Sequence, residues 1–473
     1  MTCGLFLMAA MLAPPAVAAD VPGVEEFEAL QAGAATSIEA LDGKAFSHPA
    51  ANLSRQDGMR FNLGNRLFRK IWVSSPSSTR GSDGLGPLYN ARSCEACHKE
   101  DGRGAPAWAG ENEAGLILKL GRGPANDTER QAWPDHRGRR FSDPVYGRQF
   151  QDKAVPGMSS EGRMAVTWTD LTVRLDDGTV VTLKKPAYAV TALSHGAMDP
   201  ATFLSPRLAP PMIGLGLIEA IDPADIRKNA DPDDSDKDGI SGEVRIVADE
   251  HGGPAQGLFG WKAEAPSIRL QAAIAFSNDI GISTSLFPDP HGDCTNKQRD
   301  CLARADGTGP SPHEASDEVL DLVTFYSQNL AVPARRKAKS PEVLAGKRLF
   351  FEAGCADCHH PKYRTPADAA LLNRASQTIW PYSDFLLHDM GEGLSDGPAA
   401  DMADGREWRT PPLWGIGLTR TVGGREFYLH DGRAGSIEEA ILWHDGEARK
   451  AREAYGALEK ADRQRLMKFL ESL

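Results

Sequence analysis

The sequence predicts a mainly α-helical protein with two related domains, and three observations support this prediction. The pattern Cys-x-x-Cys-His occurs twice in the 473 residues, at 94–98 and at 355–359. A stretch of apolar residues with helical spacing precedes each pattern, at 61–68 and at 344–351. Residues 451–473 have the charged amphipathic pattern of a terminal helix. A helix followed by Cys-x-x-Cys-His is how a cytochrome c domain begins, so we expect two such domains.

Each Cys-x-x-Cys-His pattern is the attachment motif of c-type haem. The two thiols form thioethers with the haem vinyl groups, and the histidine ligates the iron. With 7 Cys and 12 His in the chain, chance predicts only about 0.003 copies of the motif. We therefore expect two covalently bound haem c groups. Their predicted attachment and iron-ligating residues are Cys94, Cys97, His98, Cys355, Cys358 and His359.

The two predicted domains differ in size, because more than 250 residues separate the motifs. Residues 172–183 alternate in polarity on both sides of an Asp-Gly turn, which predicts a β-hairpin. Residues 266–285 and 314–329 have the spacing of helices. A proline and a basic run make residues 329–340 the predicted linker. The hairpin and the long loops are therefore expected as insertions in the first domain.

The predicted fold is mainly α, with two cytochrome c-like domains, the first enlarged by loop and β-hairpin insertions. We place the first domain at residues 20–335 and the second at 336–473. Residues 1–19 are apolar and end in small residues, which is typical of a secretory signal peptide. No later apolar run reaches about 18 residues, so no membrane span is expected. Covalent haem attachment on this motif is a periplasmic process, and the periplasm is the predicted location.

Two cysteines remain outside the haem motifs and the signal peptide. Cys294 and Cys301 lie in a short polar segment with six residues between them. In an oxidising compartment we favour a disulfide that closes this loop over two free thiols. A metal site with His291 is the weaker alternative, because three residues supply too few ligands.

The net charge of −12 excludes nucleic acid as an expected partner. An acidic surface would instead attract a basic partner, and we expect a small redox protein as electron donor or acceptor. Ordinary solubility explains the same charge equally well.

An acidic segment contains aspartates at alternate positions, Asp234, Asp236 and Asp238, followed by Gly239. Oxygen ligands at alternate positions before a glycine turn are typical of a calcium loop. The spacing to a terminal glutamate is incomplete, although Glu243 could contribute. A solvated acidic turn is the alternative interpretation.

Five stretches resemble one family, the bacterial di-haem oxidoreductases, which are often labelled thiol oxidoreductases. They are residues 84–98, 205–220, 387–391, 407–415 and 429–433. This family is related to the bacterial di-haem cytochrome c peroxidases and to the methylamine-utilisation di-haem enzyme. The label gains no support here, because no redox Cys-x-x-Cys remains once the haem cysteines are used.

The resemblance implies a distal ligand for the second haem. The peroxidases carry this ligand in a segment like residues 430–444, and the aligned position here is His444. Ligation by His359 and His444 would give this haem a low potential for an electron-transfer haem. The alternative is that His444 only ends a helix.

The first haem lacks the distal histidine that the peroxidases place about 16 residues after the motif. No histidine occurs between His98 and His136, so the resemblance implies an open iron site that can bind hydrogen peroxide. Candidates beside this iron are His195, Met212 and Glu219, with Glu219 as the first choice for acid–base catalysis. A core or surface position is the competing interpretation for each.

His388, His430 and Trp414 lie in stretches shared with the family, and Trp261 lies outside them. We interpret His388 and His430 as packing or propionate contacts of the second haem. Trp261 or Trp414 could lie between the haems and relay electrons, although ordinary packing is the more common role of a tryptophan.

The resemblance therefore implies a periplasmic di-haem oxidoreductase of the peroxidase type. Hydrogen peroxide is reduced at haem one, and a haem with two histidine ligands relays electrons from a partner. A di-haem carrier that only transfers electrons is one alternative, and long-range oxidation of a partner protein is another.

Overall fold

A computed structural model describes residues 23, 25, 27–110, 113–132, 141–309, 311–397 and 405–473. The predicted signal peptide, residues 1–19, lies outside these ranges. The α-helices of the described residues are α1 (Arg55–Phe68), α2 (Cys94–Cys97), α3 (Asp127–Ala132), α4 (Leu215–Glu219), α5 (Pro223–Arg227), α6 (Ile268–Ala275), α7 (Arg299–Leu302), α8 (Asp317–Gln328), α9 (Pro341–Glu352), α10 (Thr419–Gly423), α11 (Ile437–Leu442), α12 (Arg449–Ala457) and α13 (Lys460–Ser472).

The strands are mostly short and pair in small sheets. They are β1 (Val73–Ser74), β2 (Asp83–Leu85), β3 (Leu88–Tyr89), β4 (Leu116–Gly121), β5 (Gln149–Phe150), β6 (Lys153–Ala154), β7 (Arg163–Arg174), β8 (Val180–Thr191), β9 (Phe203–Leu208), β10 (Ile246–Ala248), β11 (Pro254–Gln256), β12 (Tyr363–Arg364), β13 (Thr378–Ile379), β14 (Leu387–Asp389) and β15 (Glu407–Arg409). Over the described residues, the largest sheet has the strand order β5-β4-β9 and is antiparallel.

The prediction of a mainly α, cytochrome c-like fold is wrong. The fold is mixed, with 31% helix and 18% strand. The predicted helices and hairpin are present, but strands also occur in both halves of the chain, including β12 to β15. Strands of two or three residues are too short to show the alternation of polarity by which a strand is recognised in a sequence. The predicted terminal helix is also divided, into α12 and α13.

Serine residues define where six of the helices begin. Each serine side chain accepts a hydrogen bond from the backbone N–H three residues later, which satisfies a donor that the helix itself leaves free. These serines are Ser54, Ser93, Ser267, Ser316, Ser340 and Ser436, before α1, α2, α6, α8, α9 and α11. The cap at Ser93 fixes the short helix that carries the first pair of haem cysteines.

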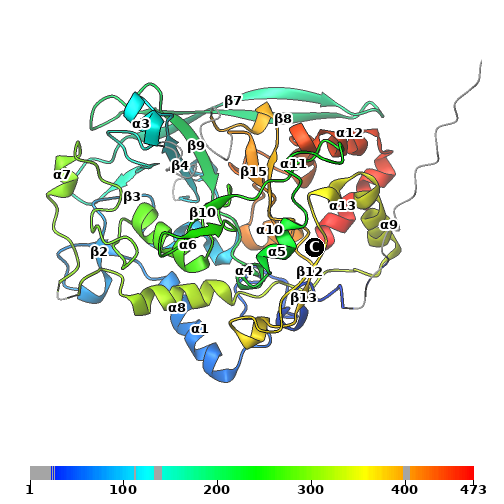
Figure 1. Cartoon of the computed structure of the whole chain (residues 1–473), viewed down its shortest axis with the longest axis horizontal. Coiled ribbons are helices and arrows are strands. Elements are labelled where there is room, and N and C mark those ends of the chain that lie inside the picture. The colour runs from blue at the N-terminus through cyan, green and yellow to red at the C-terminus, as the bar shows by residue number, and fades with distance from the viewer. Residues whose placement is uncertain are drawn as a thin grey trace, which may run out of the picture.

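Two pairs of helices pack closely at equivalent places in the two halves. Helix α1 packs against α8, and α9 packs against α13 (Figure 1). A Cβ atom on Gly64 would lie 2.3 Å from the carbonyl oxygen of Leu322, and one on Gly346 would lie 1.9 Å from that of Arg465. Only glycine allows these helices to approach so closely, which explains why both helices before the motifs contain one.

The hairpin of β7 and β8 connects the two halves of the molecule. Figure 1 shows it extending along the top of the molecule toward α12. Leu175 and Leu183, near its tip, join the same hydrophobic core as Tyr455 and Leu466. Asp177 in the turn accepts a hydrogen bond of 2.7 Å from the Arg463 guanidinium. The insertion predicted for the first domain therefore packs against the last two helices.

The predicted linker is partly buried. Arg335 forms an ion pair with Glu28, and Lys347 Nζ lies 2.9 Å from the same carboxylate. Glu28 is 0% exposed, so this is a buried link between the N-terminal segment and α9. The boundary predicted at residue 335 stays a prediction.

Cys294 and Cys301 form the predicted disulfide, with their Cα atoms 6.3 Å apart. His291 hydrogen-bonds through its ring to the carbonyl of Arg304, so the metal alternative gains no support.

Replacing Gly64 by alanine should lower the free energy of unfolding by about 2 kcal/mol, because the methyl group would force α1 away from α8. Gly58 lies on the same helix, and a methyl group added there would meet no described atom within 4 Å, so Gly58→Ala should instead stabilise by about 0.5–1 kcal/mol. Urea unfolding of both variants measures the difference. Equal effects would show that the close helix contact is not the cause.

Candidate functional site

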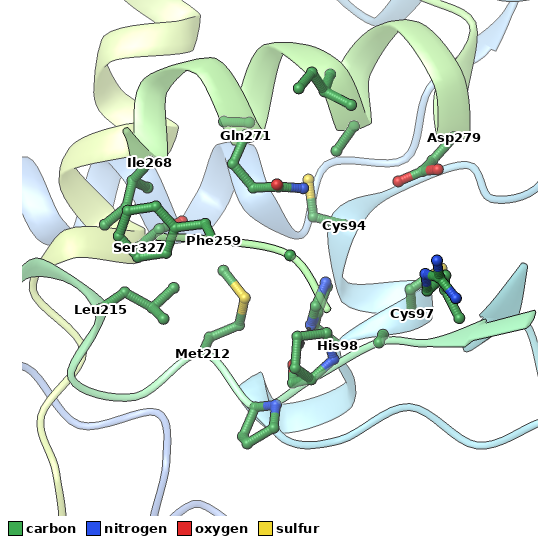
Figure 2. A pocket seen from close by; sticks show the side chains of 18 of the residues that line it. Cys94, Cys97, His98, Met212, Leu215, Phe259, Ile268, Gln271, Asp279 and Ser327 are labelled. Carbon is green, nitrogen blue, oxygen red and sulfur yellow. Dashed lines mark hydrogen bonds between the residues drawn. The ribbon is translucent and has the colours of Figure 1, made fainter. Parts of the chain in front are cut away.

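Each Cys-x-x-Cys-His motif borders its own cavity. Cys94, Cys97 and His98 line the first, and His359 with its two cysteines lines the second. The cavities have similar volumes, about 260 and 310 Å³, so the same kind of group would fit in both. Figure 2 shows the first cavity, with Met212 and Gln271 around the space beside His98. The two motifs are therefore placed as two similar binding sites.

Three predicted iron ligands are held in the same way. The Nδ1 atom of His98 lies 2.8 Å from the carbonyl oxygen of Pro210, and that of His359 lies 2.8 Å from the carbonyl oxygen of Tyr382. The Nδ1 atom of His444 lies 2.7 Å from its helical neighbour, the carbonyl of residue 440. A carbonyl can only accept, so each Nδ1 carries the proton and each Nε2 keeps its lone pair. This is the usual arrangement of a metal-ligating histidine.

The protein also keeps these imidazoles neutral. Burial lowers the pKa of His98 and of His359 to about 4, and it lowers the pKa of His444 as well. His444 is close enough to His359 for a charge on one ring to depress the pKa of the other. His359 and His444 line the same cavity, as a pair of ligands must. Neutral imidazole is the form that binds a metal.

The four cysteines of the motifs are not paired in disulfides. Burial raises the pKa of the Cys94 and Cys355 thiols to about 12, and it raises the pKa of Cys97 and Cys358 too. A reactive or redox cysteine needs a lowered pKa, so these thiols are unsuited to thiol exchange. Their position beside the cavities suits attachment of a group that fills each cavity.

The first cavity differs from the second in its histidines. Among the described residues, His98 is the only histidine that lines it. Met212, one of the three predicted candidates, does line it. So do two residues that the sequence did not single out, Glu264 and Gln271. Gln271 could have been found, because it interrupts the apolar face of the predicted helix 266–285.

Glu219 does not line either cavity. Its carboxylate accepts hydrogen bonds from the backbone of Ile268 at 2.9 Å and from the amide of Gln328 at 2.6 Å. The Arg374 guanidinium lies 3.3 Å away. These contacts join α4 to α6 and α8, so the structure gives Glu219 a role in packing.

His195 also lies outside both cavities. Its backbone N–H donates to the Tyr146 hydroxyl at 3.2 Å, and the two rings are 6.3 Å apart. A catalytic role for His195 has no basis in this placement.

His388 and His430 line the second cavity, as expected from the sequence for contacts of the second group. His388 lies between the carboxylates of Asp384 and Glu447, at 2.8 and 2.6 Å. Burial opposes a charge on His388, but the Asp384 carboxylate and the nearby Cys358 sulfur raise its pKa well above the usual value. His430 stacks on Trp408 with ring centres 3.7 Å apart. One histidine is thus a charged contact and the other an aromatic one.

Four residues line both cavities and form the wall between them: Arg103, Trp261, Arg409 and Pro411. The indole of Trp261 donates a hydrogen bond of 2.7 Å to the carbonyl of Leu208, which fixes the ring. Trp414, the other tryptophan considered, lines neither cavity. No pattern in the sequence predicts that Arg103 lies in the wall between the two cavities.

The acidic segment brings together a different set of aspartates from the predicted one. Carboxylate oxygens of Asp231, Asp234 and Asp236 lie within 4.8 Å of one another. Asp238 is outside this group, and its carboxylate accepts from the backbone of Ile240 at 2.7 Å. Calcium binding stays a prediction.

The residues present fit two haem groups. Each cavity offers two thiols, a histidine with a free Nε2 and a largely apolar lining. Arg103, which borders both cavities, has unused hydrogen-bond donors. Its Nε and Nη1 atoms are shielded from solvent and have no hydrogen-bond partner in the part of the chain that is described. A group with carboxylates would supply the missing acceptors.

A family model described as "Di-haem oxidoreductase, putative peroxidase" matches residues 27–473. No curated protein matches the chain. None of the helices in the described residues has the length and apolar character needed to cross a membrane.

A buried acid supports the segment that follows the first motif. Asp101 accepts hydrogen bonds from Tyr326 at 2.7 Å and from Ser47 at 2.6 Å. Its backbone carbonyl accepts from the N–H of Met212 at 2.9 Å, which connects the motif to a residue of the cavity. Burial raises the pKa of Asp101 to about 6.

Because this pKa is higher in the folded chain than in the unfolded chain, the wild type should lose stability as pH rises from about 4 to about 6. Asparagine does not titrate, so Asp101→Asn should not show this loss. The free energy of unfolding of Asp101→Asn minus that of the wild type should therefore be roughly 1–3 kcal/mol larger at pH 7 than at pH 4. Urea unfolding at both pH values measures the change. Asp127, which is 92% exposed, is the control, and Asp127→Asn should leave the pH dependence unaltered. An unchanged difference for Asp101→Asn would contradict the prediction.

Proposed function

The chain belongs to the family of di-haem oxidoreductases, and on this basis we propose that it reduces hydrogen peroxide with electrons from a partner protein. The observation that carries the proposal is the inequality of the two cavities. Among the described residues one histidine, His98, lines the first, whereas His359 and His444 line the second, each with its Nε2 lone pair available. Haem held in these cavities would supply an iron for peroxide in the first and an electron-transfer iron in the second.

Reduction of one hydrogen peroxide to two waters consumes two electrons and two protons, so the first cavity needs a group that moves protons. Glu264 is a carboxylate that lines this cavity, and Gln271, which lines the same cavity, can donate a hydrogen bond to peroxide. Asp279 is the other carboxylate among the described residues that line this cavity, and it accepts a hydrogen bond of 2.6 Å from the Gln149 amide. We assign proton transfer between the two peroxide oxygens to Glu264.

Electrons would pass from the second cavity to the first through the wall between them. Trp261 borders both cavities and is fixed by its hydrogen bond to Leu208, so it offers a rigid aromatic path. If His359 and His444 both held the second haem, they would favour its oxidised form and exclude peroxide from its iron. We therefore assign electron transfer, and not peroxide binding, to the second site, on the basis of His359 and His444.

The cellular setting is part of the proposal. The apolar stretch at residues 1–19 and the covalent haem attachment predicted from both motifs support a periplasmic location. A small basic redox protein is the proposed electron donor, because the net charge of −12 would attract it.

A protein that only carries electrons is the second candidate, and Met212 is the observation that favours it. This residue lines the first cavity and could provide a thioether ligand to a haem held there. The two candidates differ in the spin state of the first haem.

The oxidised protein should contain two covalent haems, one high-spin and one low-spin, in its ferric absorption and EPR spectra. His444→Ala should convert the low-spin component to high-spin, because it removes the second ligand of the second iron. His291 lines neither cavity, so His291→Ala should leave the spectra unchanged. A wild-type spectrum with only low-spin haem would favour the electron carrier.

Glu264→Gln should lower kcat/KM for hydrogen peroxide about 100-fold or more, because the amide cannot carry the proton. Glu219→Gln provides the comparison, since the structure places this residue in helix packing, and its kcat/KM should stay within about threefold of wild type. Stopped-flow assays of fully haem-loaded variants measure both. A larger loss for Glu219→Gln would return acid–base catalysis to that residue.

A further inference from the structure

The wall between the cavities carries positive charge. Of the four residues that border both cavities, Arg103 and Arg409 are arginines. Arg409 donates hydrogen bonds to the carbonyl of Gly260 at 2.9 Å and to the carbonyl of Thr410 at 3.1 Å. The protein therefore satisfies part of Arg409 with its own backbone.

In the described part of the chain, Arg103 lacks such backbone acceptors for part of its guanidinium. Its Nε and Nη1 atoms are shielded from solvent and lack a hydrogen-bond partner among the described residues. The guanidinium lies against two aromatic rings, 5.8 Å from the centre of Trp261 and 5.8 Å from that of Tyr428. Aromatic faces attract a cation, but they do not replace hydrogen-bond acceptors. Arg103 is thus a charge with unused donors at the point where the two cavities meet.

Such a charge is costly unless an anion accompanies it. Burial lowers the pKa of Arg103 to about 10, so the side chain still carries its charge at neutral pH. The planar guanidinium has five donors in a fork that matches a carboxylate. Each haem carries two carboxylates on its propionate chains, and haem is the group that the cavities on both sides of Arg103 fit.

We propose that Arg103 is a positioning residue shared by the two haems: it binds a carboxylate of each and raises the reduction potential of both. This inference rests on the proposed haem binding and goes beyond it. A positive charge near an iron disfavours the more positive oxidised state, so the same cation acts on both couples. Since one side chain serves both sites, the two potentials are linked by a single residue.

The test is a spectroscopic redox titration of the haem-loaded full chain and of Arg103→Met. Both midpoint potentials should fall, each by about tenfold in the reduction equilibrium constant, which equals 59 mV for a one-electron couple. Arg103→Lys keeps the charge and should restore most of both potentials. Arg420, which is 69% exposed and borders neither cavity, is the control, and Arg420→Met should leave both potentials unchanged.

A fall in only one potential, or in neither, would overturn the shared role of Arg103. If Arg103→Met does not accumulate with two haems, Arg103→Gln provides a neutral side chain that still fills the space and donates a hydrogen bond, with the same expected fall. The haem content of each sample, measured as the pyridine haemochrome, separates the two levels of the proposal. A wild-type chain without two haems contradicts the proposed function, whereas full loading with unchanged potentials contradicts only this inference.

Discussion

The hydrogen bond from a histidine Nδ1–H to a backbone carbonyl is the interaction on which both sites depend. It occurs at His98, His359 and His444, and it fixes each ring in the tautomer whose Nε2 can bind a metal. The carbonyls belong to segments far from the motifs in two of the three cases, at Pro210 and Tyr382. The ligands are therefore oriented by tertiary structure, and burial then keeps them neutral. A local motif alone would leave the rings free to turn.

Because the ligands are oriented by tertiary structure, the contacts that fix the two halves of the molecule relative to each other matter for both sites. The wall between the cavities combines Arg103 and Trp261 from the first half with Arg409 from the second. Its geometry survives only if the halves cannot shift. The β7–β8 hairpin fixes the halves through the hydrogen bond between Asp177 and Arg463. The buried ion pairs of Glu28 fix the N-terminal segment against the second half. Buried ion pairs add little net stability but penalise any other arrangement strongly.

The sequence predicts the features whose cause is local. An Asp-Gly turn is sufficient for the hairpin, and two nearby cysteines are sufficient for the disulfide. Features set by three-dimensional contacts were missed, including the short strands that make the fold mixed instead of mainly α. Glu219 shows most clearly why a site residue can be misplaced when only the sequence is considered. Its neighbour Ile218 lines the first cavity, but successive residues on a helix point about 100° apart, so Glu219 faces α6 and α8 instead.

The charges around the first cavity suggest why a covalent cofactor suits this fold. Arg103, Lys119, Arg207 and Arg409 line it, and within the described ranges only Arg207 among them has an ion pair shorter than 4 Å, with the buried Asp396. In a site that holds its ligand by affinity alone, such cations would act mainly to retain the ligand's carboxylates. Thioether bonds would retain haem without their help. The attraction between the cations and the carboxylates would then act mainly on the difference between the oxidised and reduced states, and would set the reduction potential instead of the affinity.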